Sequence, residues 1–292
     1  MTTIGFIGLG IMGRPMAFNL LTAGYELVGL SRHCEVRDQL VERGARAALD
    51  VETACSDADV IITMLPDSPD VAEVVLGERG VLNSAKPGSL YIDMSTVSPD
   101  VEREIALEGR RKGIRSLDAP VSGGEKGAID ATLSIMVGGE KEDFLLAMPI
   151  FKALGSTIAH VGPNGAGQTV KAANQLIIAG AIEVLSEAIV FLQASGVEMD
   201  AAMTVLAGGL AGSRIMEAKS QAMIASQFTP GFRLDLHRKD LGIVLDAAKR
   251  AGVAVPATGL TAQLFAAAVS QGLGHQDHSA LIEVLKGLSA QA

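Results

Sequence analysis

A lysine and an asparagine stand three positions apart at the start of a predicted long apolar helix. They are Lys171 and Asn174 of the segment GAGQTVKAANQ (165–175), which continues as LIIAGAIEVLSEAIVFL. At 3.6 residues per turn this spacing places both side chains near one face, so Asn174 could orient Lys171 or a substrate. A lysine partly removed from water can act as a proton donor, because desolvation lowers its pKa. Considered alone, such a lysine is more often a surface residue, so the surrounding elements must decide.

Three glycines near the N-terminus have the spacing of a dinucleotide-binding loop. The segment FIGLGIMGRPMAFNL (6–20) carries Gly8, Gly10 and Gly13 between an apolar strand and an amphipathic helix. In the G-x-G-x-x-G pattern the first glycine permits a tight turn, the second lets a pyrophosphate approach, and the third lets the helix pack on the strand. The helix N-terminus then favours the bound anion. The alternative is a glycine-rich turn without a ligand. We expect the whole loop to bind cofactor, that is Gly8, Leu9, Gly10, Ile11, Met12 and Gly13.

The end of the second strand bears on the choice between NADP and NAD. A unit that binds NAD carries an Asp or Glu about 20 residues beyond the glycines. Here the chain reads Leu30-Ser31-Arg32-His33, with no acid before Glu35. Arg32 could pair with a 2′-phosphate and Ser31 could hydrogen-bond it, which favours NADP(H) and leaves NAD(H) possible. The alternative is that Arg32 is a solvated loop residue.

Two further strand ends are expected to contact the cofactor, because doubly wound sheets bind ligands at the carboxyl ends of their strands. Met64, Leu65 and Pro66 end one apolar strand, and Thr96 follows the next. The turn after Thr96 also predicts a helix start, with Ser98 as the cap and a proline at the first helical position.

A glycine pair in DAPVSGGEKGAIDATL (118–133) could hold a substrate carboxylate. Ser122 offers a hydroxyl, and Gly123 and Gly124 offer unobstructed backbone N–H groups. A plain glycine-rich turn explains the same residues equally well.

Short apolar strands alternate with amphipathic helices up to about residue 160. Strands are expected at 3–8, 26–30, 60–65, 90–94, 116–120, 133–137 and 157–161, and a helix at 99–113. This alternation predicts a mainly parallel sheet covered on both faces. Beyond residue 163 the sequence predicts Ala-rich helices and no strand. We therefore expect an α/β Rossmann-type domain (1–163) and an all-α domain (164–292), joined by a helix at 166–194, about 45 Å long.

Composition excludes several classes of protein. The chain has 292 residues and a net charge of −9, which argues against nucleic-acid or anionic-membrane partners. Cys34 and Cys55 have no metal-ligand spacing and form no disulfide framework, so a reducing cytoplasm is expected. The N-terminus does not resemble a signal peptide. We expect the apolar runs to be too short to span a bilayer, because Glu183 and Glu187 interrupt them.

Two remaining patterns concern metals and assembly. His275 and His278 have H-x-x-H spacing but lack supporting ligands, so no metal site is expected. The apolar stripes of the Ala-rich helices predict a homodimer or homotetramer.

The segments FIGLGIMGRPMAFNL, DAPVSGG and GAGQTVKAANQ, in this order and spacing, resemble the β-hydroxyacid dehydrogenases over essentially the whole chain. The resemblance implies that Lys171 is the general acid/base and that Asn174 assists it, with Gln175 a weaker candidate. It also implies that Ser122, Gly123 and Gly124 grip the substrate carboxylate.

Lys239 acquires a role from the resemblance alone. Its local pattern predicts an i,i+4 pair with Asp235 on a helix. The family motif instead implies that Lys239 reaches the nicotinamide and the substrate.

Four segments resemble, within the family, the members that reduce tartronate semialdehyde to glycerate: VIITMLPDSPDV, DAPVSGGEKGAIDATLSIMVGG, GGLAGS and FTPGFRLDLHRKDL. The implied reaction is reversible hydride transfer between NAD(P)H and the aldehyde carbon, with Lys171 protonating the alkoxide. Two alternatives stay open. One is a sister enzyme, a 3-hydroxyisobutyrate dehydrogenase acting on methylmalonate semialdehyde or a reductase of succinic semialdehyde or glyoxylate. The other is a non-catalytic nucleotide-binding module, which the retention of Lys171 and the glycines disfavours.

Overall fold

The computed structural model describes residues 2–289, which form two compact units. The first ends at Lys171 and the second begins at Ala172. Helix α9 (Ala166–Ala194) starts in the first unit and continues into the second. The predicted domain boundary at residue 163 stays a prediction, since a helix runs through the region where the division must be placed.

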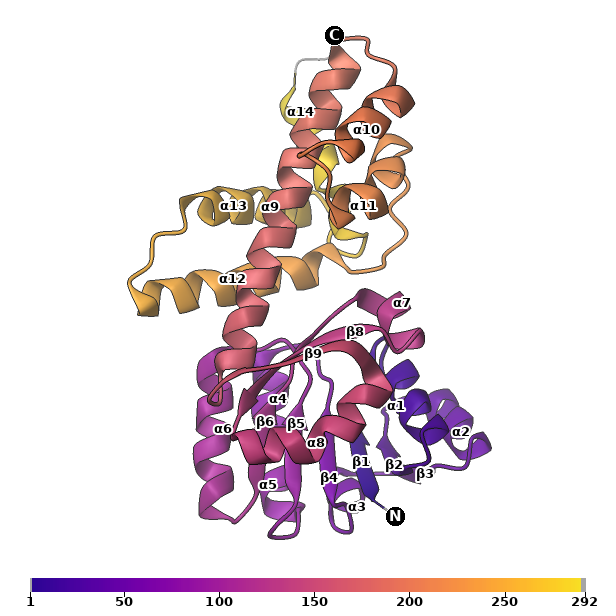
Figure 1. The fold of residues 1–292 in the computed structure, drawn as a ribbon, viewed down its shortest axis with the longest axis vertical. Coiled ribbons are helices and arrows are strands. Elements are labelled where there is room, and N and C mark those ends of the chain that lie inside the picture. The colour runs from indigo at the N-terminus through magenta and orange to yellow at the C-terminus, as the bar shows by residue number, and fades with distance from the viewer. Residues whose placement is uncertain (1, 290–292) are drawn as a thin grey trace. The chain divides into compact units, whose positions relative to one another are not determined.

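The first unit is built on one sheet of nine strands (Figure 1). Its order is β3-β2-β1-β4-β5-β6-β8-β7, and β9 pairs with β8. The strands are β1 (Thr3–Ile7), β2 (Glu26–Leu30), β3 (Arg46–Ala48), β4 (Val60–Thr63), β5 (Leu90–Asp93), β6 (Arg115–Asp118), β7 (Val121–Ser122), β8 (Leu133–Gly139) and β9 (Gly155–Gly162). Strands β1 to β6 pair in parallel, whereas β8 is antiparallel to β6 and β7. The mainly parallel sheet predicted from the sequence is confirmed.

Helices cover both faces of this sheet because successive side chains of each strand point to opposite sides. Ile4 and Phe6 lie in one buried cluster, and Ile7 lies in the other. Helices α1 and α8 contribute to the first cluster, and α3, α4, α5 and α6 to the second. The helices of the unit are α1 (Gly13–Thr22), α2 (Cys34–Glu42), α3 (Val51–Cys55), α4 (Ser68–Leu76), α5 (Val81–Ser84), α6 (Pro99–Arg111), α7 (Gly124–Ile129) and α8 (Lys141–Leu154).

The second unit is helical, as predicted. Besides most of α9 it contains α10 (Met199–Gly208), α11 (Arg214–Ile224), α12 (Leu234–Ala251), α13 (Pro256–Ser270), a 3₁₀ turn (His278–Leu281) and α14 (Ile282–Leu288). Within its described residues, extended pairing is limited to one isolated bridge between Arg233 and Asp277. The fold class expected from the sequence, a Rossmann-type α/β region followed by helices, is confirmed.

Helix α9 is long and apolar enough to cross a membrane by length and composition, in spite of Glu183 and Glu187. The expectation that Glu183 and Glu187 leave the apolar runs too short is therefore wrong by length and composition. A core helix of a soluble protein passes the same test. Ala179 and Ile182 lie in one buried cluster of the second unit, and Ile189 lies in the other. The side of α9 that carries these three residues therefore fills the core of the helical unit.

Candidate active site

The glycine loop between β1 and α1 has room for a ligand at one of its three glycines. Gly8 has a φ of +98°, and a Cβ there would lie 2.3 Å from the Met64 carbonyl oxygen. A Cβ on Gly13 would lie 1.9 Å from the Gly8 carbonyl oxygen, so this glycine packs the helix against the loop. A Cβ on Gly10 would meet nothing within 4 Å. The loop therefore fits a pyrophosphate approaching at Gly10, ahead of the helix N-terminus.

The side chains between these glycines differ in exposure. Leu9 is buried in the core, whereas Ile11 is 52% exposed. Met12 is half-buried and precedes the first residue of α1. Leu9 can therefore contribute to cofactor binding through its backbone, not its side chain.

The end of β2 presents the two residues expected to select the cofactor. Ser31 is buried, and its Oγ accepts a hydrogen bond of 3.1 Å from the His33 backbone N–H. Arg32 is exposed. The structure places both residues at the carboxyl end of a strand parallel to β1, where an adenosine ribose is expected.

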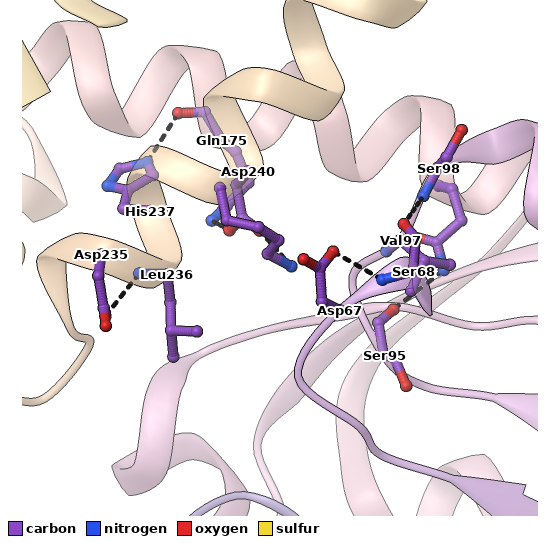
Figure 2. Close-up of polar contacts among 12 residues, drawn as sticks. Asp67, Ser68, Ser95, Val97, Ser98, Gln175, Asp235, Leu236, His237 and Asp240 are labelled. Carbon is purple, nitrogen blue, oxygen red and sulfur yellow. Dashed lines mark hydrogen bonds and ion pairs between the residues drawn. The ribbon is translucent and has the colours of Figure 1, made fainter. Parts of the chain in front are cut away.

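The loops that follow β4 and β5 are fastened to each other. The Leu65 N–H donates to Ser95 Oγ at 2.8 Å. The Ser98 N–H donates to Ser68 Oγ at 3.0 Å (Figure 2). The predicted cofactor segment Met64–Pro66 therefore lies beside the segment that carries Thr96. The predicted cap is also present, since Ser98 Oγ accepts from an N–H in the first turn of α6.

Three buried acids, which sequence reasoning missed, lie at the carboxyl ends of β5 and β6 and at the start of α6. Asp93 ends β5, Asp118 ends β6, and Glu102 lies in the first turn of α6. Burial, with the negative charge of Asp93 beside it, raises the pKa of Glu102 well above its usual value. Burial also raises the pKa of Asp118, although its carboxylate accepts from the Gly165 N–H at 2.7 Å and the Gln168 N–H at 3.0 Å. The available signal was an acid at the end of an apolar strand, in YID and SLD.

The predicted carboxylate loop follows β7. Gly123 and Gly124 have φ values of +143° and +62° and are exposed, and Ser122 is half-buried. Helix α7 begins at Gly124, and the Asn19 side chain of α1 donates to the Ala128 carbonyl in α7 at 2.7 Å. The loop is thus held at both ends, by β7 and by α7.

Lys171 lies in the second turn of α9 and is 7% exposed. A lysine near the start of a helix ordinarily lies on the surface. Lys171 does not follow this rule, because its side chain is buried. A buried lysine must have polar neighbours or lose its charge readily. Either property suits a group that gives and takes a proton.

Within the second unit, Gln175 and Asp240 link Asn174 to Lys239 through polar contacts. Asn174 Nδ2 donates to Gln175 Oε1 at 2.8 Å, and Gln175 Nε2 donates to the Asp240 carboxylate. Lys239 Nζ pairs with Asp240 Oδ1 at 2.8 Å, and Asp235 pairs with Arg233. Sequence reasoning missed Asp240, which the adjacent lysine in the segment HRKDL could have indicated.

A histidine pair extends this network. His237 Nε2 lies 3.1 Å from the Gln175 carbonyl oxygen, and the Nδ1 atoms of His237 and His278 lie 2.9 Å apart (Figure 2 shows the first contact). Burial, assisted by His237, lowers the pKa of His278 well below its usual value. Two neutral imidazoles satisfy these contacts, with His237 donating to Gln175 and accepting from His278. His275, the other member of the H-x-x-H pattern, is exposed.

Comparison with known proteins assigns the chain to a family. The family model described as the NAD binding domain of 6-phosphogluconate dehydrogenase matches residues 3–162. The one described as the NAD-binding region of NADP-dependent 3-hydroxyisobutyrate dehydrogenase matches residues 165–285. This chain belongs to the β-hydroxyacid dehydrogenase family. As a β-hydroxyacid dehydrogenase it is an NAD(P)-dependent oxidoreductase that acts on CH–OH groups.

Relatives of this β-hydroxyacid dehydrogenase cover nearly its whole length. The 2-hydroxy-3-oxopropionate reductase of Escherichia coli (strain K12) is 42% identical over 97% of each chain. The NAD-dependent L-serine dehydrogenase of Pseudomonas aeruginosa is 37% identical over 96% of each chain. Among solved structures, the Mycobacterium tuberculosis 3-hydroxyisobutyrate dehydrogenase with L-serine is 33% identical, with a TM-score of 0.89, covering 98% of this chain and 99% of that one. The relatives share fold and reaction class but differ in substrate.

Proposed function

We propose that this dehydrogenase reduces tartronate semialdehyde (2-hydroxy-3-oxopropanoate) to glycerate, reversibly, with Lys171 as the general acid/base. The observation that carries the proposal is the buried lysine in the second turn of α9, in a first unit that also holds the glycine loop and the Ser122-Gly123-Gly124 loop. The identity of 42% to 2-hydroxy-3-oxopropionate reductase supports this substrate over others.

The chain's residues bind the substrate and move one proton. Ser122 Oγ and the N–H groups of Gly123 and Gly124 hold the substrate carboxylate. The nicotinamide cofactor, when bound, supplies the hydride. Lys171 gives its proton to the oxygen of the former aldehyde as negative charge develops there, and it takes a proton from the hydroxyl in the reverse direction. The lysine is most effective if it is already in place when this charge appears.

Further residues orient the substrate and the cofactor. Asn174 and Lys239 are proposed to contact the substrate, and Lys239 also the nicotinamide, with Gln175 and Asp240 holding them in place. The glycine loop from Gly8 to Gly13 binds the pyrophosphate. The cofactor is also contacted by Met64, Leu65, Pro66 and Thr96.

NADP(H) is the cofactor that this β2 end favours. Arg32 is exposed and able to reach a 2′-phosphate, and Ser31 is at the same strand end. No acid stands where the ribose 2′-hydroxyl of NAD would be bound. NAD(H) is the second candidate, because one relative is named as NAD-dependent.

The assembly proposed is a homodimer or homotetramer. Ile177, Val184 and Phe191 of α9 are 67%, 58% and 70% exposed and recur every seven residues, which aligns them along one side of the helix. A second copy of the chain would cover this stripe. The proposed location is the cytoplasm, with a small-molecule substrate and neither nucleic acid nor membrane as partner.

A second candidate function is that of a 3-hydroxyisobutyrate dehydrogenase, which the similar Mycobacterium tuberculosis structure supports. The test is kcat/KM of the purified protein for tartronate, methylmalonate and succinic semialdehydes and for glyoxylate, each with NADPH and NADH. We expect tartronate semialdehyde with NADPH to give the highest value. A higher value for another aldehyde would move the substrate assignment. Turnover of none, with NADPH still bound, would favour the non-catalytic binding module.

A further inference from the structure

Gln168 is a buried polar residue on α9 whose side chain bridges the two sides of Thr96. Its exposed fraction is 1%. Its Nε2 donates to the Ser95 carbonyl oxygen at 2.9 Å, and its Oε1 accepts from the Val97 N–H at 3.2 Å. One carboxamide thus fixes the peptide groups on both sides of Thr96, across more than 70 positions of the chain.

The helical turn that carries Gln168 is itself fixed to the sheet. The backbone N–H groups of Gly165 and Gln168 both donate to the carboxylate of Asp118, at the end of β6. A Cβ on Gly167 would lie 2.4 Å from the Met136 carbonyl oxygen, so the helix backbone lies directly against β8. Glu102 adds a contact of 3.5 Å to Gln168 Nε2. The start of α9 therefore cannot shift without breaking these contacts.

Lys171 follows Gln168 by three residues, which is less than one turn of helix and about 4.5 Å along its axis. We propose that Gln168 is a positioning residue for proton transfer: by clamping the peptides on both sides of Thr96, it fixes Lys171 relative to the segment that contacts the cofactor. This inference rests on the proposed role of Lys171. Its chemical reason is that hydride and proton must reach the two adjacent atoms of one carbonyl group.

A double-mutant cycle separates this role from simple support of the fold. Gln168→Met keeps the side-chain volume and removes both hydrogen bonds. We expect it to lower kcat about 10- to 100-fold, as a displacement of about 1 Å can do, and to leave KM for NADPH within about threefold. In a Lys171→Ala background the same replacement should lower the residual kcat by less than about threefold, because its effect passes through the lysine. Gln193→Met, at an exposed position of the same helix, is the control and should match the wild type.

The conservative variant Gln168→Glu provides a second readout that does not depend on the first variant folding well. A neutral carboxylic acid can donate to Ser95 and accept from Val97, whereas a carboxylate cannot donate. We expect kcat of Gln168→Glu, relative to wild type, to be highest at low pH and to fall as pH rises. The ratio for Gln168→Met should stay flat over the same range.

Each outcome is decisive. Losses that are additive in the double mutant, or a Gln168→Met enzyme with wild-type kcat, would overturn the positioning role and leave Lys171 as the proton donor. A flat Gln168→Glu ratio would also overturn it. Full activity of Lys171→Ala alone would instead overturn the proposed function, and this inference with it.

Discussion

At the scale of single residues, the glycine loop shows that one residue type can be required for different reasons. At Gly13 the protein itself fills the space a Cβ would need, because the Gly8 carbonyl oxygen lies 1.9 Å from that position. At Gly10 the space is open. Gly13 is therefore needed by the fold, whereas Gly10 leaves the open space that the proposed pyrophosphate site requires.

This difference predicts opposite outcomes for two matched variants. Gly13→Ala should lower the free energy of unfolding by about 1–3 kcal/mol, because the methyl group overlaps backbone. Gly10→Ala should leave it within about 0.5 kcal/mol and weaken NADPH binding about tenfold or more, a loss of about 1.4 kcal/mol. Thermal unfolding and a fluorescence titration with NADPH measure the two effects. Unchanged NADPH binding in Gly10→Ala would contradict the position given to the pyrophosphate.

Arg32 is the residue proposed to give the preference for NADP(H). Arg32→Ala should raise KM for NADPH about tenfold, since hydrogen bonds to a charged group contribute about 1.5–3 kcal/mol, and should leave KM for NADH unchanged. Arg46→Ala, at an exposed arginine on β3, is the control. Equal effects on the two cofactors would show that Arg32 does not contact the 2′-phosphate.

At the scale of elements, the sequence predicts what depends on composition and periodicity. Helix α9 has the predicted bounds of 166 and 194, because its long apolar run contains no proline and little glycine. Strand β3 was missed because its sequence, RAA, lacks β-branched residues, and β7 was missed because it has two residues. The bonds from Gln168 to Ser95 and Val97 could not be predicted, since nothing local links positions so far apart.

The buried acid of helix α6 gives a prediction about pH. Burial raises the pKa of Glu102 in the folded protein well above the ordinary glutamate value of 4.5. As pH rises above that value the unfolded chain releases this proton and the folded chain retains it, so the folded state becomes relatively less stable. The stability gain of Glu102→Gln over wild type should therefore grow from about pH 5 to about pH 8. Thermal unfolding at several pH values measures this gain.

Glu104→Gln, an exposed position on the same helix, is the control for that experiment. Its difference from wild type should not grow over this pH range. If the difference between Glu102→Gln and wild type is constant with pH, the acid is not held protonated by the fold.

At the scale of the whole molecule, two sides of α9 differ in their exposure to solvent. One side supplies the helical core, through Ala179 and Ile182 among others, and another presents the exposed stripe of Ile177, Val184 and Phe191. A stripe of this kind is unfavourable in water unless another surface covers it. Net charge and composition could not locate this stripe, because finding it required the exposure of each side chain.

The stripe predicts the effect of a single charge on assembly. Val184→Glu should reduce the mass measured by light scattering after size-exclusion chromatography, because an isolated buried carboxylate opposes association. Leu145→Glu, at an exposed leucine on α8 of the first unit, should leave the mass unchanged. An unaltered oligomer in Val184→Glu would place the interface elsewhere.

The proposed reaction depends on the buried Lys171 of α9 as the donor of the proton in the reduction of a semialdehyde. The most direct test is the initial rate of NADPH oxidation with tartronate semialdehyde for the wild type, Lys171→Ala and Lys152→Ala, the last at an exposed lysine on α8. We expect Lys171→Ala to be slower by at least about 10²-fold and Lys152→Ala to match the wild type. A Lys171→Ala enzyme that turns over at the wild-type rate would contradict this role of the lysine.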